Sequence, residues 1–412
     1  MSTTKESIAG RSNMASASRG VLFFFALVYI IFDYARPQAI IPIGFLRPSL
    51  VTVLILTVLL LKDGNIWQAG SRQTTLIVLF NILIAAYIPF ARNNMAAFQT
   101  SWVMLAYVPF ILAVIVSVDT VNRLKRLINW LILIMIYQAV YAILHGGVGA
   151  GNYFQDENDL SLYVNMWLPF CYFLLLRERN IWMKVLYVTG MGAGVLAIVI
   201  SFSRGGFIGL VCMGMVVWWF SSKKIVSCLI ICLCAFLVYA VGGTKYADEM
   251  STITNLEEST ARERILSWKA AWAMFLDNPL GVGGNNFQKS FHRYQPEEMS
   301  RGMWNRVAHS LWFTLIPELG VVGIILFFAL LWYNLKDIFH LSELTKGKGG
   351  DARYLHQLSL ACIATLAGFF ASATFLSVLY YAHYWYLTGL IVAAERISRC
   401  YSYENMKAAS EN

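Results

Sequence analysis

Three residues of this chain combine reactive side chains with positions at the edges of apolar segments. Arg204 lies between two apolar stretches in Ser-Phe-Ser-Arg-Gly-Gly, Arg264 falls in the first turn of a predicted helix, and His309 opens a further apolar stretch. A guanidinium pairs bidentately with a phosphate, and an imidazole can take up a proton near neutral pH. These residue types are suited to bind an anionic group and to act as a base.

Each of the three also has a structural explanation, and their spacing alone leaves both interpretations open. Arg204 fits either a ligand site or a side chain that snorkels to the membrane surface beside a Gly205–Gly209 helix contact. Arg264 fits either an anion site at a helix N-terminus or a solvated surface position. A lone histidine such as His309 is more often a structural residue than a base.

The composition places these residues in a membrane protein. Of 412 residues, 58% are hydrophobic and 13% are charged, and the mean hydropathy is +0.58. Soluble domains carry about 25% charged residues. The net charge of +9 is better explained by membrane topology than by nucleic-acid binding. Motifs of soluble enzymes such as GxSxG, HExxH and Walker A are absent from the sequence.

Apolar segments of the length needed to cross a bilayer, about 20 residues, recur along the chain. Twelve are predicted, at 20–35, 40–61, 74–90, 98–118, 124–145, 160–176, 181–202, 205–220, 224–242, 309–335, 356–379 and 382–398. The predicted fold is therefore an all-α polytopic membrane protein with about 12 transmembrane helices, a number good to about one pair. It is divided into a tail (1–19), about nine spans (20–242), a large loop (243–308), about three spans (309–398) and a tail (399–412).

Lysine and arginine counts predict how these segments are oriented. With both termini inside, the inside tails and short loops hold 20 basic residues and the outside short loops hold 4. Since basic residues accumulate on the cytoplasmic side, the loop at 243–308 is predicted to lie outside. That loop carries eight basic residues, and its apolar stripe of Ile265, Trp268, Trp272, Phe275 and Leu276 predicts a helical cap that ends at 277–279. Such a cap suits an anionic, lipid-borne substrate.

Further carboxylates lie near these segments. Glu318 lies about nine residues into the span that His309 opens. At that depth it needs a partner, and we expect an arginine from a neighbouring helix. Asp156, Glu157 and Asp159 form an acidic run on the outside face, which fits either a solvated loop or a divalent-cation site.

Taken together, the sequence resembles the O-antigen ligase family. The resemblance is carried by Ser203 to Gly206, by Arg264 to Phe287 with Arg-x3-Trp-x2-Ala and Asn-Pro-Leu-Gly-Val-Gly, and by Ala308 to Gly323. Weaker support comes from Gly147 to Asn165 and from Tyr34 to Pro37. One departure is Ser310, which follows the histidine where the family more often has asparagine.

The resemblance implies a glycosyltransferase of the bacterial inner membrane whose site faces the periplasm. Its donor would be a glycan on undecaprenyl diphosphate and its acceptor a hydroxyl, expected on a lipid A–core sugar. Arg204 and Arg264 would bind the diphosphate and His309 would activate the hydroxyl, with no metal or other cofactor. A substrate-binding role for the diphosphate or glycan is expected for Arg36, Arg47, Asp156, Asn158 and Asn286.

Two alternatives remain open. An O-antigen polymerase or a protein O-oligosaccharyltransferase would use the same donor and similar residues, so that only the acceptor separates them. A transporter of a polyanionic lipid belongs to a different class. It would carry charges deep in several spans and often an inverted repeat, whereas here the charges gather on one face and no repeat is visible.

Overall fold

The computed structural model describes residues 17–63, 66–233, 259–299 and 305–410, with the single positions 236, 240 and 243. Every regular element in these residues is a helix. The labelled α-helices are α2 (Pro48–Asp63), α3 (Arg72–Ala86), α4 (Asn94–Ser117), α5 (Val121–Leu144), α6 (Glu157–Leu175), α7 (Ile181–Ile200), α8 (Arg204–Phe220), α10 (Ser259–Asp277), α11 (Phe287–Ser290), α12 (Leu311–Thr345), α13 (Gly350–Ala373) and α14 (Ala382–Ser410). Short π or 3-10 turns lie at Ile31–Ala35, Pro37–Ala39, Gly44–Leu46, Ile66–Ala69, Asn152–Phe154 and Phe291–Arg293.

The length and apolar character of the helices identify a multi-pass membrane protein. Within the described residues, seven helices are long and apolar enough to cross a membrane: Ala17–Ala39, Gly44–Lys62, Asn94–Ser117, Val121–Leu144, Ile181–Ile200, Leu311–Thr345 and Gly350–Ala373. Shorter apolar helices lie at Arg72–Ala86, Arg204–Phe220 and Lys224–Leu233. All twelve predicted apolar segments coincide with helices where they are described, the ninth continuously only to residue 233. The span count of twelve stays a prediction.

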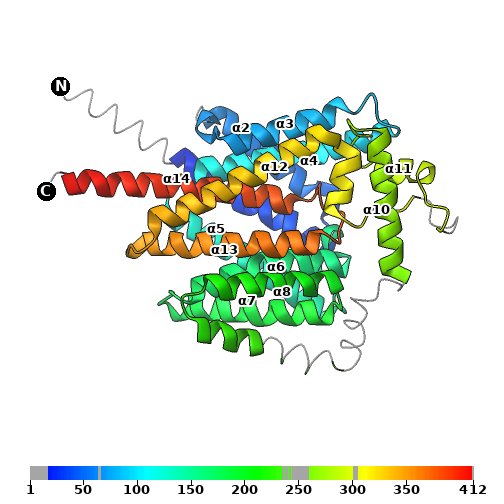
Figure 1. Ribbon diagram of the computed structural model, residues 1–412. Helices are drawn as coiled ribbons and strands as arrows, with labels where there is room; N and C mark the ends of the chain where they lie inside the picture. Colours follow the sequence, from blue (N-terminus) through cyan, green and yellow to red (C-terminus); the bar gives the residue numbers. More distant parts are fainter. Residues whose placement is uncertain are drawn as a thin grey trace.

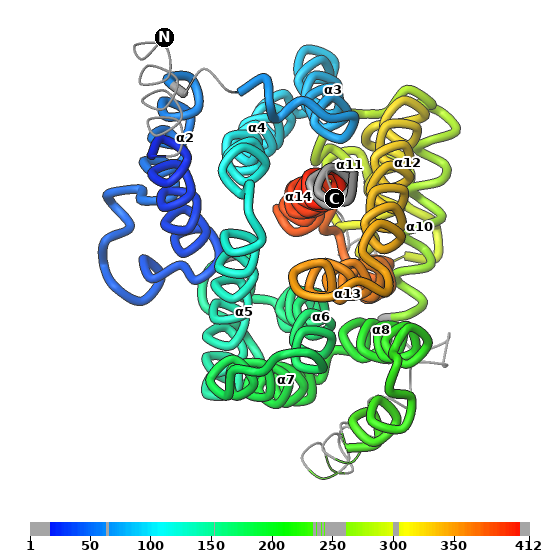
Figure 2. The backbone as a smooth tube through the Cα atoms, turned by 90° about the vertical axis from the view of Figure 1, so that its left-hand side faces the viewer, coloured from blue at the N-terminus to red at the C-terminus, as the bar shows by residue number. Residues whose placement is uncertain are grey.

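Helix α6 is surrounded by α5, α7, α8 and α13 (Figures 1 and 2). All its residues from 159 to 174 are buried, as expected of a helix that is apolar around its whole circumference. Small residues allow its neighbours to approach closely. A Cβ added to Gly209 of α8 would lie 1.9 Å from Ser372 Oγ of α13 and 2.6 Å from Asn165 Nδ2 of α6. Of the two glycines in the predicted small-residue contact, Gly209 forms it, whereas a Cβ on Gly205 would lie at an ordinary contact distance of 3.7 Å from Phe375 Cβ.

Helix α10 runs across the ends of the other helices, at the opposite end of the bundle from the last turns of α14 (Figure 1). Trp268 attaches it to the start of α12, because its Nε1 donates to the Ala308 carbonyl at 3.0 Å and its ring stacks on Phe313. The predicted aromatic stripe divides between two environments. Trp268 packs against the bundle, whereas Trp272 is 49% and Leu276 is 63% exposed.

The chain that follows α10 is built into a break in α12. Gly320 has φ 58°, a left-handed conformation that favours glycine, and a Cβ there would lie 2.3 Å from the Leu280 carbonyl carbon. Backbone hydrogen bonds join the two segments: Val282 N–H donates to Pro317 O at 3.0 Å and Val321 N–H donates to Pro279 O at 2.9 Å. The cap is thereby fixed to α12 close to His309.

Basic residues predicted to be cytoplasmic gather at the other end of the bundle. Arg19 and Arg123 both pair with Asp119, at 2.9 and 3.0 Å, and Lys125 pairs with Asp351 at 2.9 Å. Asp351 begins α13 just after the end of α12 that lies far from the cap. The orientation of these two ends relative to the membrane stays a prediction.

Candidate active site

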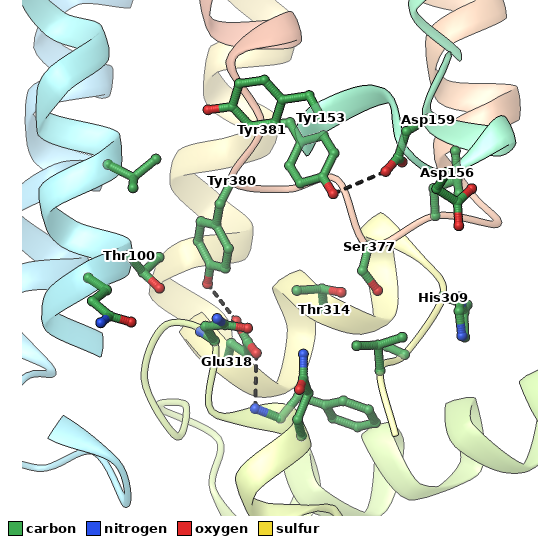
Figure 3. Close-up of a pocket in the computed structure, with 18 of the residues that line it drawn as sticks. Thr100, Tyr153, Asp156, Asp159, His309, Thr314, Glu318, Ser377, Tyr380 and Tyr381 are labelled. Atoms are coloured by element: carbon green, nitrogen blue, oxygen red, sulfur yellow. Dashed lines mark hydrogen bonds between the residues drawn. The ribbon is translucent and has the colours of Figure 1, made fainter. Parts of the chain in front are cut away.

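A cavity of about 530 Å³ lies where the cap meets the ends of several helices (Figure 3). It is enclosed by α4, by the start of α6, by the loop and short helix after α10, by the first turns of α12 and by the connection between α13 and α14. Its lining comprises Gln99, Thr100, Val103, Tyr107, Tyr153, Asp156, Asp159, Asn285, Phe287, Gln288, Val307, Ala308, His309, Thr314, Glu318, Leu376, Ser377, Tyr380 and Tyr381. Segments from much of the sequence therefore meet around one space.

His309 lies at one side of this cavity, close to Asp156 (Figure 3). It has φ 47°, a conformation that non-glycine residues rarely adopt and that costs free energy. The next residue, Ser310, caps α12 by accepting a hydrogen bond from Phe313 N–H at 3.4 Å. Serine thus serves here as a helix N-cap, and the strained backbone turns the imidazole into the cavity wall.

The imidazole of His309 is surrounded mainly by positive charge. The pKa of His309 is lowered from 6.5 to about 4, chiefly by burial and then by the charges of Arg264 and Arg306, while the charge of Asp156 opposes them. The ring is therefore neutral at pH 7, with a lone pair that can accept a proton. A base and two cations that could stabilise an anion are thus placed close together.

Arg264 and Arg306 are held near His309 by different contacts. Arg264 lies on α10 one turn before Trp268, which fixes the helix to the residue preceding His309. Arg306 lies three residues before the histidine and forms an ion pair with Glu263 at 2.7 Å. Sequence analysis did not single out Arg306, because nothing in its spacing distinguished it from the other basic residues of the loop.

Arg204 begins α8 at the same end of the bundle. The preceding residue, Ser203, accepts a hydrogen bond from Gly206 N–H at 2.9 Å and donates to Asn158 Oδ1 at 2.7 Å. Asn158 in turn donates to Asp156 Oδ1 from its backbone and side-chain nitrogens, at 2.8 and 2.9 Å. The start of α8 is thus linked through Asn158 to the cavity wall that contains Asp156.

Glu318 is 1% exposed and its partners differ from the expected arginine. It accepts hydrogen bonds from Asn285 N–H at 2.7 Å, Phe287 N–H at 2.9 Å and Tyr380 O–H at 2.7 Å. The expectation of an arginine partner is wrong, because the break in α12 brings backbone amides of the cap loop to the carboxylate. Glu318 therefore holds this loop in the cavity wall (Figure 3).

The expected substrate-binding arginines differ in position. The guanidinium carbon of Arg36 lies 4.1 Å from the ring centre of Tyr153, which lines the cavity, and Arg36 Nε donates to Asp33 O at 3.0 Å. Arg36 therefore lies behind the lining and supports it. Arg47 is exposed at the end of the 3-10 turn Gly44–Leu46 and does not line the cavity.

Asn286, another expected substrate-binding residue, is fully buried and does not line the cavity. Its Oδ1 accepts a hydrogen bond from Asn93 N–H at 2.8 Å, and its Nδ2 donates to Gly284 O at 2.9 Å and to Asn93 O at 3.3 Å. These bonds hold the cap loop on the start of α4. The geometry gives Asn286 a positioning role.

The side of the cavity formed by α6 is acidic. Asp156 is exposed and forms the N-cap of α6, while Asp159 is 8% exposed and accepts a hydrogen bond from Tyr381 O–H at 3.1 Å. In the described part of the chain, no group of three histidine, cysteine or acidic residues is arranged to hold a metal ion.

Residues 189–328 match the family model described as O-antigen ligase. This match confirms the resemblance to the O-antigen ligase family over about a third of the chain. No curated protein matches the chain. The matched segment contains Arg204, Arg264, His309 and Glu318, so the basic side of the cavity lies within it. The acidic wall of α6 lies outside it.

Proposed function

We propose that the protein transfers a glycan, the O-antigen, from undecaprenyl diphosphate to a hydroxyl of a lipid A–core sugar. The reaction would take place at the periplasmic face of the bacterial inner membrane during lipopolysaccharide assembly. The main support is the position of His309, whose neutral imidazole lines a cavity beside the charges of Arg264 and Arg306. The family match supports lipid-linked glycans as the substrate class.

In the proposed reaction, His309 removes the proton of the acceptor hydroxyl as its oxygen attacks the anomeric carbon of the donor sugar. The bond from that carbon to the diphosphate oxygen breaks, and undecaprenyl diphosphate leaves with the electron pair. Arg204 and Arg264 would stabilise the charge that develops on the leaving group, as preorganised cations do in sites with little water. The proton on His309 then passes to solvent.

The same arrangement would couple the strength of the base to binding of the donor. Without a ligand, Arg264 and Arg306 lower the pKa of His309. A diphosphate bound by Arg264 would offset the charge of this arginine, so the pKa of His309 would rise towards its ordinary value. The imidazole would therefore be a stronger base when the donor is in place. Since the donor stores the free energy of transfer and the arginines supply positive charge, the proposal requires neither a nucleotide nor a metal.

The acceptor is tested by reconstituting the full chain in lipid nanodiscs with a defined glycan on undecaprenyl diphosphate. Lipid A–core, a second lipid-linked glycan and a protein acceptor are offered separately. We expect glycan transfer to lipid A–core. Transfer only to the second glycan would identify a polymerase, and transfer only to protein would identify an oligosaccharyltransferase. Movement of the intact donor across the membrane without transfer would overturn the proposal in favour of a transporter.

A further inference from the structure

The cavity differs in charge from its surroundings in a way that bears on which sugars it can hold. Its lining contains three carboxylates, those of Asp156, Asp159 and Glu318. Among the described residues, no lysine or arginine lines it, and His309 is its single basic residue. Arg264 and Arg306 act on His309 from outside the lining. The cationic region thus lies at the edge of the cavity, beside an interior that is neutral or acidic.

The acidic wall is held in place by contacts within the protein. The Tyr153 ring is fixed by the Arg36 guanidinium and by a 2.9 Å hydrogen bond between the hydroxyls of Tyr153 and Tyr107. Tyr381 packs on Tyr153 with 5.4 Å between ring centres and donates its hydroxyl proton to Asp159. Aromatic faces and carboxylates are therefore preorganised side by side, without the need to rearrange when a ligand enters.

Uncharged hydrogen-bonding groups complete the lining. The amides of Gln99 and Gln288 and the hydroxyl of Ser377 line the cavity. Within the described part of the chain, Ser377 Oγ is buried without a hydrogen-bond partner. A buried hydroxyl without a partner is costly unless a ligand or water supplies one. Amides, hydroxyls and carboxylates are groups that bond well to the hydroxyls of a polyol.

We propose that this cavity binds an uncharged sugar ring and that Asp156 and Asp159 exclude sugars that carry a carboxylate or phosphate. This inference rests on the proposed function, and it adds a selectivity for substrate charge. Burial and the charge of Asp156 raise the pKa of Asp159 to about 7, so above that pH a second anion near the two aspartates would meet two like charges. The diphosphate would instead lie at the cationic edge. The bound ring could be the first sugar of the donor or the terminal sugar of the acceptor.

The test measures binding by calorimetry, with the full chain in nanodiscs, at a pH about one unit above the pKa of Asp159, which is about 7. Two trisaccharides are compared that differ only in their terminal ring, a hexose in one and the corresponding C6 carboxylic acid in the other. We expect the wild-type protein to bind the neutral trisaccharide at least about tenfold more tightly. Asp159→Asn and Asp156→Asn should each reduce this ratio several-fold by improving binding of the acidic sugar. Glu157→Gln is the matched control, because Glu157 lies in the same turn of α6 but does not line the cavity.

Equal binding of the two sugars by the wild-type protein would overturn the inference, as would binding of neither. It would also be overturned if the aspartate variants kept the full ratio, or if Glu157→Gln reduced it as much as they do. Asp156 is an exposed N-cap, and asparagine is a good N-cap residue, so Asp156→Asn keeps the test decisive if Asp159→Asn fails to fold.

Competition identifies the source of the bound ring. A glycosylated donor should displace the neutral trisaccharide if the ring belongs to the donor, whereas undecaprenyl diphosphate without a sugar should not. If the trisaccharide stays bound in the presence of both, the ring belongs to the acceptor. Charge-selective binding without any transfer in the nanodisc assay would reject the proposed reaction while supporting the sugar site.

Discussion

Replacing Arg306 with glutamine should shift the pH dependence of transfer by acting on His309. Arg306 is one of two arginines whose charge lowers the pKa of His309, which is about 4 in the ligand-free protein against an ordinary value of 6.5. Loss of this charge should raise the pKa of the imidazole. Glu263 would also lose its partner in the 2.7 Å ion pair, and its uncompensated negative charge would act in the same direction.

The expected size of the pKa shift in Arg306→Gln follows from the relative sizes of the effects that lower the pKa of His309. Burial makes the largest contribution to the low pKa of His309, and the charge of Arg264 lowers this pKa more than the charge of Arg306 does. Removing the smaller of the two charge effects should therefore restore a minor part of the difference, roughly half a pH unit to one unit. The pKa of His309 in the variant would then remain below its ordinary value.

The measurement is kcat/KM for transfer between pH 4 and 8, with the donor well below saturation, because this parameter reports the free enzyme. A base must be neutral to accept a proton, so the rate should fall as the pH falls through the pKa of His309. The wild-type rate should stay level down to about pH 5 and reach half its maximum near pH 4. In Arg306→Gln, the half-maximum should lie at a higher pH. A change in plateau height would report donor binding, separately from this shift.

Arg262→Gln is the control, since Arg262 is exposed on the same helix as Arg264 and is not among the charges that act on His309. The fall of its kcat/KM at low pH should match that of the wild-type protein. A wild-type half-maximum near pH 6.5 would show that burial and the arginines do not set the pKa of the base. An unchanged fall of kcat/KM at low pH in Arg306→Gln would show that Arg306 has no part in it.

Three further predictions concern the residues of the site. Arg204→Ala, Arg264→Ala and His309→Ala should each abolish transfer while the protein still inserts into the membrane; full transfer by any one variant in a nanodisc assay would remove that residue from the proposed site. Transfer should persist in EDTA, and a loss of activity that a divalent ion restores would reject the metal-free mechanism. Glu318→Gln should destabilise the protein by roughly 1–3 kcal/mol, because an amide places a donor against the donors that the carboxylate now satisfies; its thermal midpoint should fall below that of Glu343→Gln, an exposed control on the same helix, and equal midpoints would contradict this role.

Much of the architecture could be predicted from the sequence because its signals are local. An apolar run reports a membrane helix wherever the helix packs, so the segments at 124–145 and 181–202 closely match α5 (Val121–Leu144) and α7 (Ile181–Ile200). The end of the cap helix is equally local, since the Asp-Asn-Pro sequence stops α10 at Asp277. The order of the motifs in the sequence was also enough to indicate the resemblance to the O-antigen ligase family. The match over residues 189–328 confirms this resemblance.

The composition of the cavity was decided by tertiary packing alone. Tyr153 and Tyr381 are separated by more than half of the chain, yet their rings touch, because α6 and the α13–α14 connection meet at one end of the bundle. Glu318 finds its partners only because Gly320 interrupts α12 and admits the cap loop. Hydrophobic periodicity shows which face of a helix is buried, but it carries no information about which distant loop will cover that face.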